Sequence, residues 1–174
     1  MYICNNQKFK YSKGYLILPI KLSSAKFPKT LSFGNTHLQI KTSFHVSLIC
    51  IKNIEENTDI KNITEKIINI FCEFTKNHEI KFESFTGVFR FAERNKDGRK
   101  SLVGMCRITH LNEFFDKVNA DLELNISYQP THVSLYTLNL DEAIGLNSQE
   151  DIENMTKDIS IELPQEFIDE IMKN

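Results

Sequence analysis

SFHVSLICI, at residues 43–51, and THVSLYTL, at residues 131–138, share the tetrapeptide His-Val-Ser-Leu. The 174 residues contain only five histidines, and two of them lie in these two copies. Both segments have the composition and patterning of strands. Because residues i and i+2 of a strand face the same side, each copy presents an imidazole beside a hydroxyl and turns its valine and leucine to the other side.

The surrounding chain alternates between strand-like and helical patterns. Residues 14–22 and 37–41 read as strands separated by a loop rich in turn residues. Residues 60–77 place isoleucine and phenylalanine at three- and four-residue steps, which predicts an amphipathic helix. Residues 80–94 and 99–108 flank an Asp-Gly turn and predict a β-hairpin. This order of strands and helices predicts an α+β fold.

The second half of the chain adds another helix, the second motif and a mixed tail. Apolar positions over residues 111–122 predict a helix with Thr109 as its N-cap. A capping-box sequence at residues 148–151 predicts a short helix, and residues 158–163 resemble a strand. Residues 164–172 predict a last helix, whose apolar side contains Phe167, Ile168, Ile171 and Met172.

Composition indicates a soluble globular protein that forms one domain over residues 1–174, in which residues 146–174 are acidic elements without an assigned role. No apolar run approaches the roughly 20 residues of a membrane-spanning helix, and the N-terminus has no apolar signal core. None of the four cysteines lies in a Cys-x-x-Cys spacing, so we expect four reduced thiols. We therefore expect a cytoplasmic monomer that does not associate with membranes.

Charge is distributed unevenly along a chain whose net charge is −2. Residues 1–54 contain eight lysines and no acidic residue, whereas residues 108–174 contain three lysines and fourteen acidic residues. The basic first third suits an anionic ligand such as a phosphate. The same pattern also arises when folding mixes the two segments and the charges only solvate the surface, so both interpretations stay open.

If the two motif strands lie side by side or face each other, their two imidazoles converge on one cleft and can provide a base and an acid at the same time. An unperturbed histidine has a pKa of about 6.5, so near neutral pH one ring can be neutral and the other protonated. In-line displacement at phosphorus uses such a pair, because the base deprotonates the attacking oxygen while the acid protonates the leaving oxygen. Serine hydroxyls two residues along can bind the non-bridging phosphate oxygens. The candidates are therefore His45 and His132 for catalysis, and Ser47 and Ser134 for the phosphate.

Two His-x-Ser-apolar strands separated by most of a small α+β domain resemble the two-histidine (2H) phosphoesterase superfamily, which contains cyclic phosphodiesterases and 2′-5′ RNA ligase-like proteins. The likeness extends from residues 14–20 to residues 131–137 and rests on the two motifs and the order of elements. It implies two pseudo-symmetric lobes of antiparallel sheet with flanking helices and a central cleft. It also implies the two histidines as acid and base. The two serines, where many relatives have threonine, would bind phosphate.

Three tyrosines are weaker candidates for stacking on a base. Tyr136 has the same strand parity as His132 and Ser134 and can line the cleft, but it is equally compatible with ordinary packing at a strand end. Tyr11 and Tyr15 lie in the basic N-terminal segment. The other three histidines lack the neighbouring serine, so we assign them no role.

The paired motifs predict a metal-independent phosphodiesterase without a cofactor. The resemblance implies that it acts on a 2′,3′-cyclic phosphate, a 2′-5′ linkage or a related cyclic or oligonucleotide bond. The expected partner is a nucleotide, an oligonucleotide or an RNA end. The alternatives are a nucleotide- or RNA-binding module with the same cleft but little turnover, a metal site, and a serine hydrolase. No HxH, HExxH or carboxylate spacing completes a metal site, and no GxSxG elbow supports a serine nucleophile.

Overall fold

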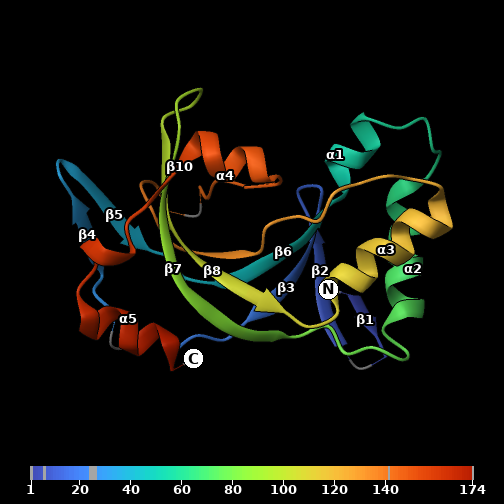
Figure 1. The fold of residues 1–174 in the computed structure, drawn as a ribbon, viewed down its shortest axis with the longest axis horizontal. Coiled ribbons are helices and arrows are strands. Elements are labelled where there is room, and N and C mark those ends of the chain that lie inside the picture. The colour runs from blue at the N-terminus through green and yellow to red at the C-terminus, as the bar shows by residue number, and fades with distance from the viewer. Residues whose placement is uncertain (1, 6, 24–26, 141, 174) are drawn as a thin grey trace.

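The structure, a computed structural model, describes residues 2–5, 7–23, 27–140 and 142–173. Within them the fold is α+β, as the sequence predicts, with a large antiparallel sheet and several helices (Figure 1). The strands are β1 (Tyr2–Cys4), β2 (Gln7–Ser12), β3 (Tyr15–Ile20), β4 (Thr30–Phe33), β5 (Thr36–Ile40), β6 (Phe44–Cys50), β7 (Phe82–Arg94), β8 (Arg99–Ile108), β9 (His132–Thr137) and β10 (Thr156–Asp158). The helices are α1 (Ile51–Glu56), α2 (Ile63–Phe74), α3 (Leu111–Leu122), α4 (Gln149–Met155) and α5 (Gln165–Met172), with a 3₁₀ turn, η2, at Ser160–Glu162.

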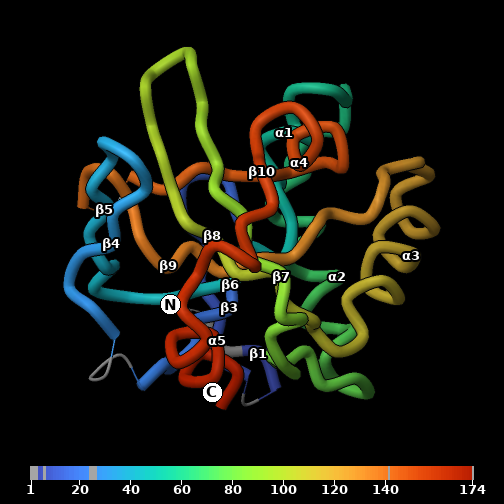
Figure 2. The backbone as a smooth tube through the Cα atoms, turned by 60° about the vertical axis from the view of Figure 1, so that its left-hand side comes forward, coloured from blue at the N-terminus to red at the C-terminus, as the bar shows by residue number. Residues whose placement is uncertain are grey.

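The sheet follows the order β1-β2-β3-β6-β9-β8-β7-β10. One edge of β9 is shared, because β6 pairs with its first half and β5 with its second half. Strand β4 continues the sheet beyond β5. The hairpin of β7 and β8 extends beyond the rest of the sheet in both views (Figures 1 and 2). The two motif strands are therefore neighbours at the centre of the sheet.

Helices α2, α3 and α5 cover one face of the sheet, here called the outer face, at its two ends. Figure 1 places α2 and α3 side by side at one end and α5 at the other. The apolar sides of α2 and α3 meet through the Phe71 and Phe114 rings, whose centroids are 5.3 Å apart, over Leu16 and Leu48 of the sheet. Helix α5 buries Phe167 in a second cluster with β7, β8 and β9. Removing these apolar side chains from water stabilises the fold.

Several local predictions are confirmed and others are wrong. The capping box is present, since the Asp151 amide donates to Ser148 Oγ at 3.1 Å and the Ser148 amide donates to Asp151 Oδ2 at 3.2 Å. The N-cap of α3 is His110, in a left-handed conformation, because the Thr109 hydroxyl donates instead to the Glu79 carbonyl. The strand predicted at residues 158–163 is wrong beyond its first residue. Asp158 Oδ1 accepts hydrogen bonds from the amide and hydroxyl of Ser160 and so starts a turn.

The final helix departs from its predicted apolar side at one position. Phe167 and Ile171 are buried as expected, and Ile168 is partly buried against the same cluster. Met172 is 43 % exposed, so it does not belong to the buried side. The helix ends at this residue.

The structure also contains elements that the sequence does not predict. The hairpin of β1 and β2 precedes the first predicted strand, β4 lies within the predicted loop, and α1 follows β6 directly. Each is too short to show a clear period, and each is stabilised by contacts with distant segments. Residues 24–26 of the predicted loop lie outside the described residues. No helix in the described part of the chain is long and apolar enough to cross a membrane.

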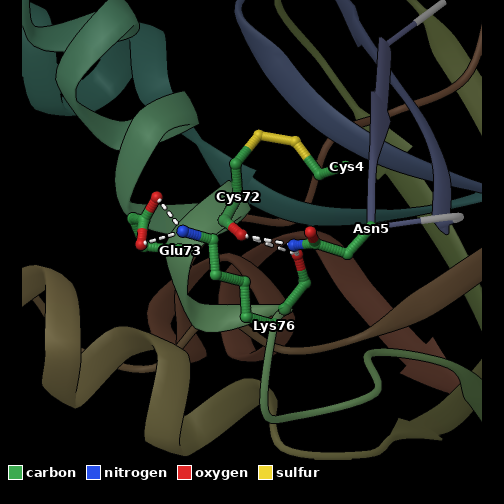
Figure 3. Close-up of a disulfide and its surroundings, with 6 residues drawn as sticks. Cys4, Asn5, Cys72, Glu73 and Lys76 are labelled. Carbon is green, nitrogen blue, oxygen red and sulfur yellow. Dashed lines mark hydrogen bonds and ion pairs between the residues drawn. A yellow bond between two sulfur atoms is a disulfide. The ribbon is translucent and has the colours of Figure 1, made fainter.

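The expectation of four reduced thiols is wrong for two of the cysteines. Cys4 and Cys72 form a disulfide with their Cα atoms 5.0 Å apart (Figure 3). Beside it, Asn5 Nδ2 donates to the Cys72 carbonyl at 2.6 Å, which ties the end of β1 to α2. Only the tertiary fold brings these cysteines together, since 68 positions separate them in the chain. Disulfides are uncommon in cytosolic proteins, so the cytoplasmic location stays a prediction.

Candidate active site

The two motifs meet on neighbouring strands. β6 and β9 are antiparallel and pair at the motif valines, Val46 and Val133. In this antiparallel register, His45 lies opposite Ser134 and Ser47 lies opposite His132. Four polar side chains thus share one face of the sheet, here called the inner face: His45, Ser47, His132 and Ser134.

The apolar residues of the two motifs hold these strands in place from the outer face. Val46, Leu48, Val133 and Leu135 are all fully buried there. The two copies also share an irregularity at their leucines. Leu48 has no partner on β3 where that register shifts, and Leu135 has none on β8. The repeated sequence therefore corresponds to a repeated backbone conformation, a β-bulge immediately after the polar pair.

The spacing of the four groups suits a phosphate. Directly opposite residues of an antiparallel pair have Cα atoms about 4.5–5.5 Å apart. The two histidines are diagonal neighbours, for which the separation is about 7–8 Å. A phosphorus atom between the two rings can therefore have one imidazole on each side of an in-line displacement. His45 and Ser47 are half-buried, whereas His132 and Ser134 are only 6 % and 7 % exposed, so ligands have better access from the β6 side.

Burial dominates the electrostatics of His132. It lowers the pKa of this imidazole to about 4, because the charged form loses its hydration. Backbone groups of Pro130 and Ile144 partly offset this lowering of the pKa, and the charge of His45 adds to it. These groups are near the ring, yet Nδ1 is buried and has no well-formed hydrogen bond to any described residue. At neutral pH His132 is therefore uncharged and able to accept a proton.

His45 lies in a more positive and more accessible environment. Its pKa is also lowered, first by burial and then by the charges of Lys41 and Lys10. Lys41 follows β5 and is 5 % exposed, whereas Lys10 is exposed on β2. Motif analysis missed both lysines as site residues. The signal that could have found them is the basic first third of the sequence, which the structure brings to the first histidine.

The acidic C-terminal region covers part of the inner face. Ile144, Leu146 and Ile152 form a cluster with Val103, which is paired with Ser134 across β8 and β9. The segment is anchored at Tyr15, whose hydroxyl accepts a hydrogen bond from Asn147 Nδ2 at 3.0 Å. This region, which the sequence left without a role, therefore shields the side of the site that contains His132.

The three tyrosines have different surroundings. Tyr136 is fully buried and its hydroxyl donates to the Pro28 carbonyl at 2.7 Å, so it cannot stack on a base. The parity argument is wrong there, because the bulge at Leu135 turns Tyr136 to the outer face. Tyr11 is also placed against the outer-face core. Tyr15 is near the inner face but is bound to the C-terminal segment, and burial raises its pKa to about 12.

Two further hydroxyls extend the polar strip along the inner face. Ser101 on β8 is paired in register with Thr137 on β9, beyond the bulge. Both side-chain oxygens are buried and have no hydrogen-bond partner among the described residues. An unpaired buried polar group costs about 1–3 kcal/mol. Both residues are fully buried, so the two oxygens are unsatisfied polar atoms inside the fold beside the candidate site.

The described residues offer no metal-binding cluster. No three or more His, Cys, Asp or Glu side chains among them are close enough to hold a metal ion. A groove of about 750 Å³ lies between α2 and α3, and its lining includes His78, Glu113 and Asp116 but neither motif histidine.

Comparisons with protein-family models, with curated proteins and with solved structures find no match to this chain. The functional interpretation therefore depends on the motifs and on the geometry of the inner face.

Proposed function

We propose that the chain is a metal-independent phosphodiesterase that hydrolyses a 2′,3′-cyclic phosphate, a 2′-5′ phosphodiester or a related cyclic or oligonucleotide bond. The observation that carries this proposal is the register of β6 and β9, which sets each motif histidine opposite the serine of the other motif. Two imidazoles and two hydroxyls on one face match the demands of in-line displacement at phosphorus. The similarity to 2H phosphoesterases in motif and order of elements agrees with this chemistry.

The unequal burial of the histidines assigns their roles in the proposed reaction. His132 is neutral at neutral pH and takes a proton from the attacking water. His45 is more accessible and, once protonated beside the bound phosphate anion, gives its proton to the leaving oxygen. One P–O bond forms to the water oxygen and the P–O bond to the leaving oxygen breaks. Ser47 and Ser134 donate hydrogen bonds to the non-bridging oxygens, and solvent then resets both imidazoles.

A nucleotide- or RNA-binding module with little turnover is the second candidate. The observation that favours it is the cover over His132, which is 6 % exposed beneath the segment that contains Ile144. A base with a pKa of about 4 is weak unless the bound phosphate raises it. In either case the proposed partner is a nucleotide, an oligonucleotide or an RNA end, bound by a monomer.

A substrate panel with and without a chelator tests the proposal. The panel contains 2′,3′-cyclic nucleotides, 2′-5′ oligonucleotides and cyclic oligonucleotides, and we expect turnover that the chelator does not reduce. On the best substrate, His45→Ala and His132→Ala should each lower kcat by about 10²–10⁴-fold. His37→Ala, at an exposed histidine outside both motifs, is the matched control and should keep full activity. Full activity in either motif variant would exclude the mechanism, and binding without turnover would favour the second candidate.

A further inference from the structure

The Tyr15 hydroxyl lies where the C-terminal segment meets the start of β3. It accepts a hydrogen bond from Asn147 Nδ2 at 3.0 Å, across 132 positions of the chain. Tyr15 is also paired with Cys50 at the end of β6, and its hydroxyl interacts with that thiol. Burial raises the pKa of Tyr15 to about 12, so the hydroxyl keeps its proton at neutral pH. It can therefore serve as a fixed polar anchor.

The segment of residues 144–147 passes directly against this hydroxyl. A Cβ added to Gly145 would lie 2.5 Å from the Tyr15 oxygen, so a larger residue requires a shift of the chain. Asn147 is also held from its other side, because its amide donates to Asp151 Oδ2 at 2.6 Å. The side-chain contact with Tyr15 therefore fixes this part of the segment to β3.

The residue before Gly145 lies against the His132 ring. Ile144 is 1 % exposed and packs with Val103, beside the second motif. Backbone groups of Ile144 and Pro130 interact with the ring and favour its protonated form. They are carbonyls, because only an acceptor stabilises the charged imidazole through a hydrogen bond and proline has no N–H. The segment anchored at Tyr15 therefore presents a carbonyl to the candidate base.

This carbonyl can determine which nitrogen of His132 carries the proton. Nδ1 is buried, so Nε2 is the nitrogen left to act on a ligand. A carbonyl that accepts from Nδ1–H keeps Nε2 free of a proton, as a base requires. The Nδ1 contact is not well formed in the structure, and such bonds often tighten only when a substrate binds. Its formation depends on how firmly the segment holds Ile144 in place.

We propose that Tyr15 is a positioning residue for His132, because its hydroxyl fixes Asn147 and thereby keeps the Ile144 carbonyl against the imidazole. The inference rests on the proposed function for the catalytic use of His132, but positioning of the ring requires no turnover. It gives the C-terminal segment a role in orienting the base in addition to covering it. It also replaces base stacking as the role of Tyr15.

NMR of the His132 ring in Tyr15→Phe tests the inference, since this change removes the hydroxyl and keeps the aromatic ring. At pH 7.5 we expect the wild type to have Nδ1 protonated and the variant to show a mixture of both tautomers. A loosened segment also lets water reach the ring, so the His132 pKa should rise from about 4 toward the ordinary value of about 6.5. His45, which also acts on this ring, is unchanged in the variant.

A second variant and a matched control make the result specific. Asn147→Ala removes the other half of the same hydrogen bond and should reproduce the effect, and combining it with Tyr15→Phe should add little. Tyr128→Phe is the control, because this hydroxyl donates to Asp116 Oδ1 at 2.7 Å on α3, which covers the outer face. It should leave the His132 ring as in the wild type. A wild-type tautomer and pKa in folded Tyr15→Phe would overturn the proposal, and Asn147→Ala decides if Tyr15→Phe does not fold.

Kinetics on the best substrate of the panel separate this inference from the proposed activity. Tyr15→Phe should lower kcat about 10- to 100-fold and keep KM within about threefold, because a misplaced catalytic group slows the chemical step. A raised KM with unchanged kcat would make Tyr15 a substrate-binding residue and overturn the positioning role. A changed His132 ring in a protein without turnover would reject the phosphodiesterase and keep the positioning role. Lowered kcat with an unchanged ring would do the reverse.

Discussion

Replacing His132 with glutamine should remove part of the acid sensitivity of this fold. The buried imidazole is neutral in the folded protein, with a pKa of about 4, whereas the unfolded chain has the ordinary value of about 6.5. Between these two values the unfolded state binds a proton that the folded state does not. The stability that His132 contributes is therefore complete above pH 6.5 and is lost as the pH falls toward 4.

The two pKa values set the size of the effect. Each tenfold difference in proton affinity corresponds to about 1.4 kcal/mol, so the full loss approaches about 3 kcal/mol below pH 4. At pH 5 the same relation gives a loss of about 2 kcal/mol relative to pH 7.5. A loss of this size is a large fraction of the roughly 5–15 kcal/mol that holds an ordinary domain folded.

Urea denaturation of the wild type and His132→Gln at pH 7.5, 6, 5 and 4.5 measures this effect. The carboxylates titrate in both proteins, so the difference between their pH profiles isolates His132. We expect the wild type to lose about 2 kcal/mol more than the variant between pH 7.5 and 5. The exposed His37, replaced in His37→Gln, serves as control and should follow the wild type. Parallel profiles for the wild type and His132→Gln would show that His132 is not buried in its neutral form.

Three further predictions concern the segments that frame the site. An added Cβ at Gly145 would lie 2.5 Å from the Tyr15 hydroxyl oxygen, so Gly145→Ala should destabilise by about 1–3 kcal/mol, and less in a Tyr15→Phe background; a double-mutant cycle by urea denaturation checks this. Replacing both Cys4 and Cys72 with serine should cost about 4 kcal/mol, because the disulfide closes a loop across 68 positions; thermal unfolding with and without reductant should then agree for the variant and differ for the wild type. Ser148→Ala removes the capping box and should cost about 1 kcal/mol, whereas Ser148→Thr should retain most of the stability when both are measured by denaturation.

The sequence alone was sufficient to predict those elements whose pattern lies within one continuous segment. The periods of α2 and α3, the hairpin of β7 and β8 and the capping box at Ser148 are all legible in single stretches of sequence. The two motifs could also be interpreted from their own sequence. Strand alternation places histidine and serine on one face, and the buried valine and leucine on the other. The errors arise where distant segments decide the outcome. Tyr136 was assigned to the wrong face because the bulge at Leu135 belongs to the pairing of β9 with β8 and leaves no sign in the sequence of β9.

The amino-acid sequence thus established an α+β chain with two strands that each present histidine and serine on one side. The tertiary structure alone decided that these strands are neighbours in a register that sets each histidine opposite the other serine. It also decided that Lys41 joins the first histidine and that the C-terminal segment covers the second. The physical reason is that strand parity depends on the backbone of one segment. Register, burial and the charge around a group depend on which distant segments meet, and many different pairings satisfy the same local pattern.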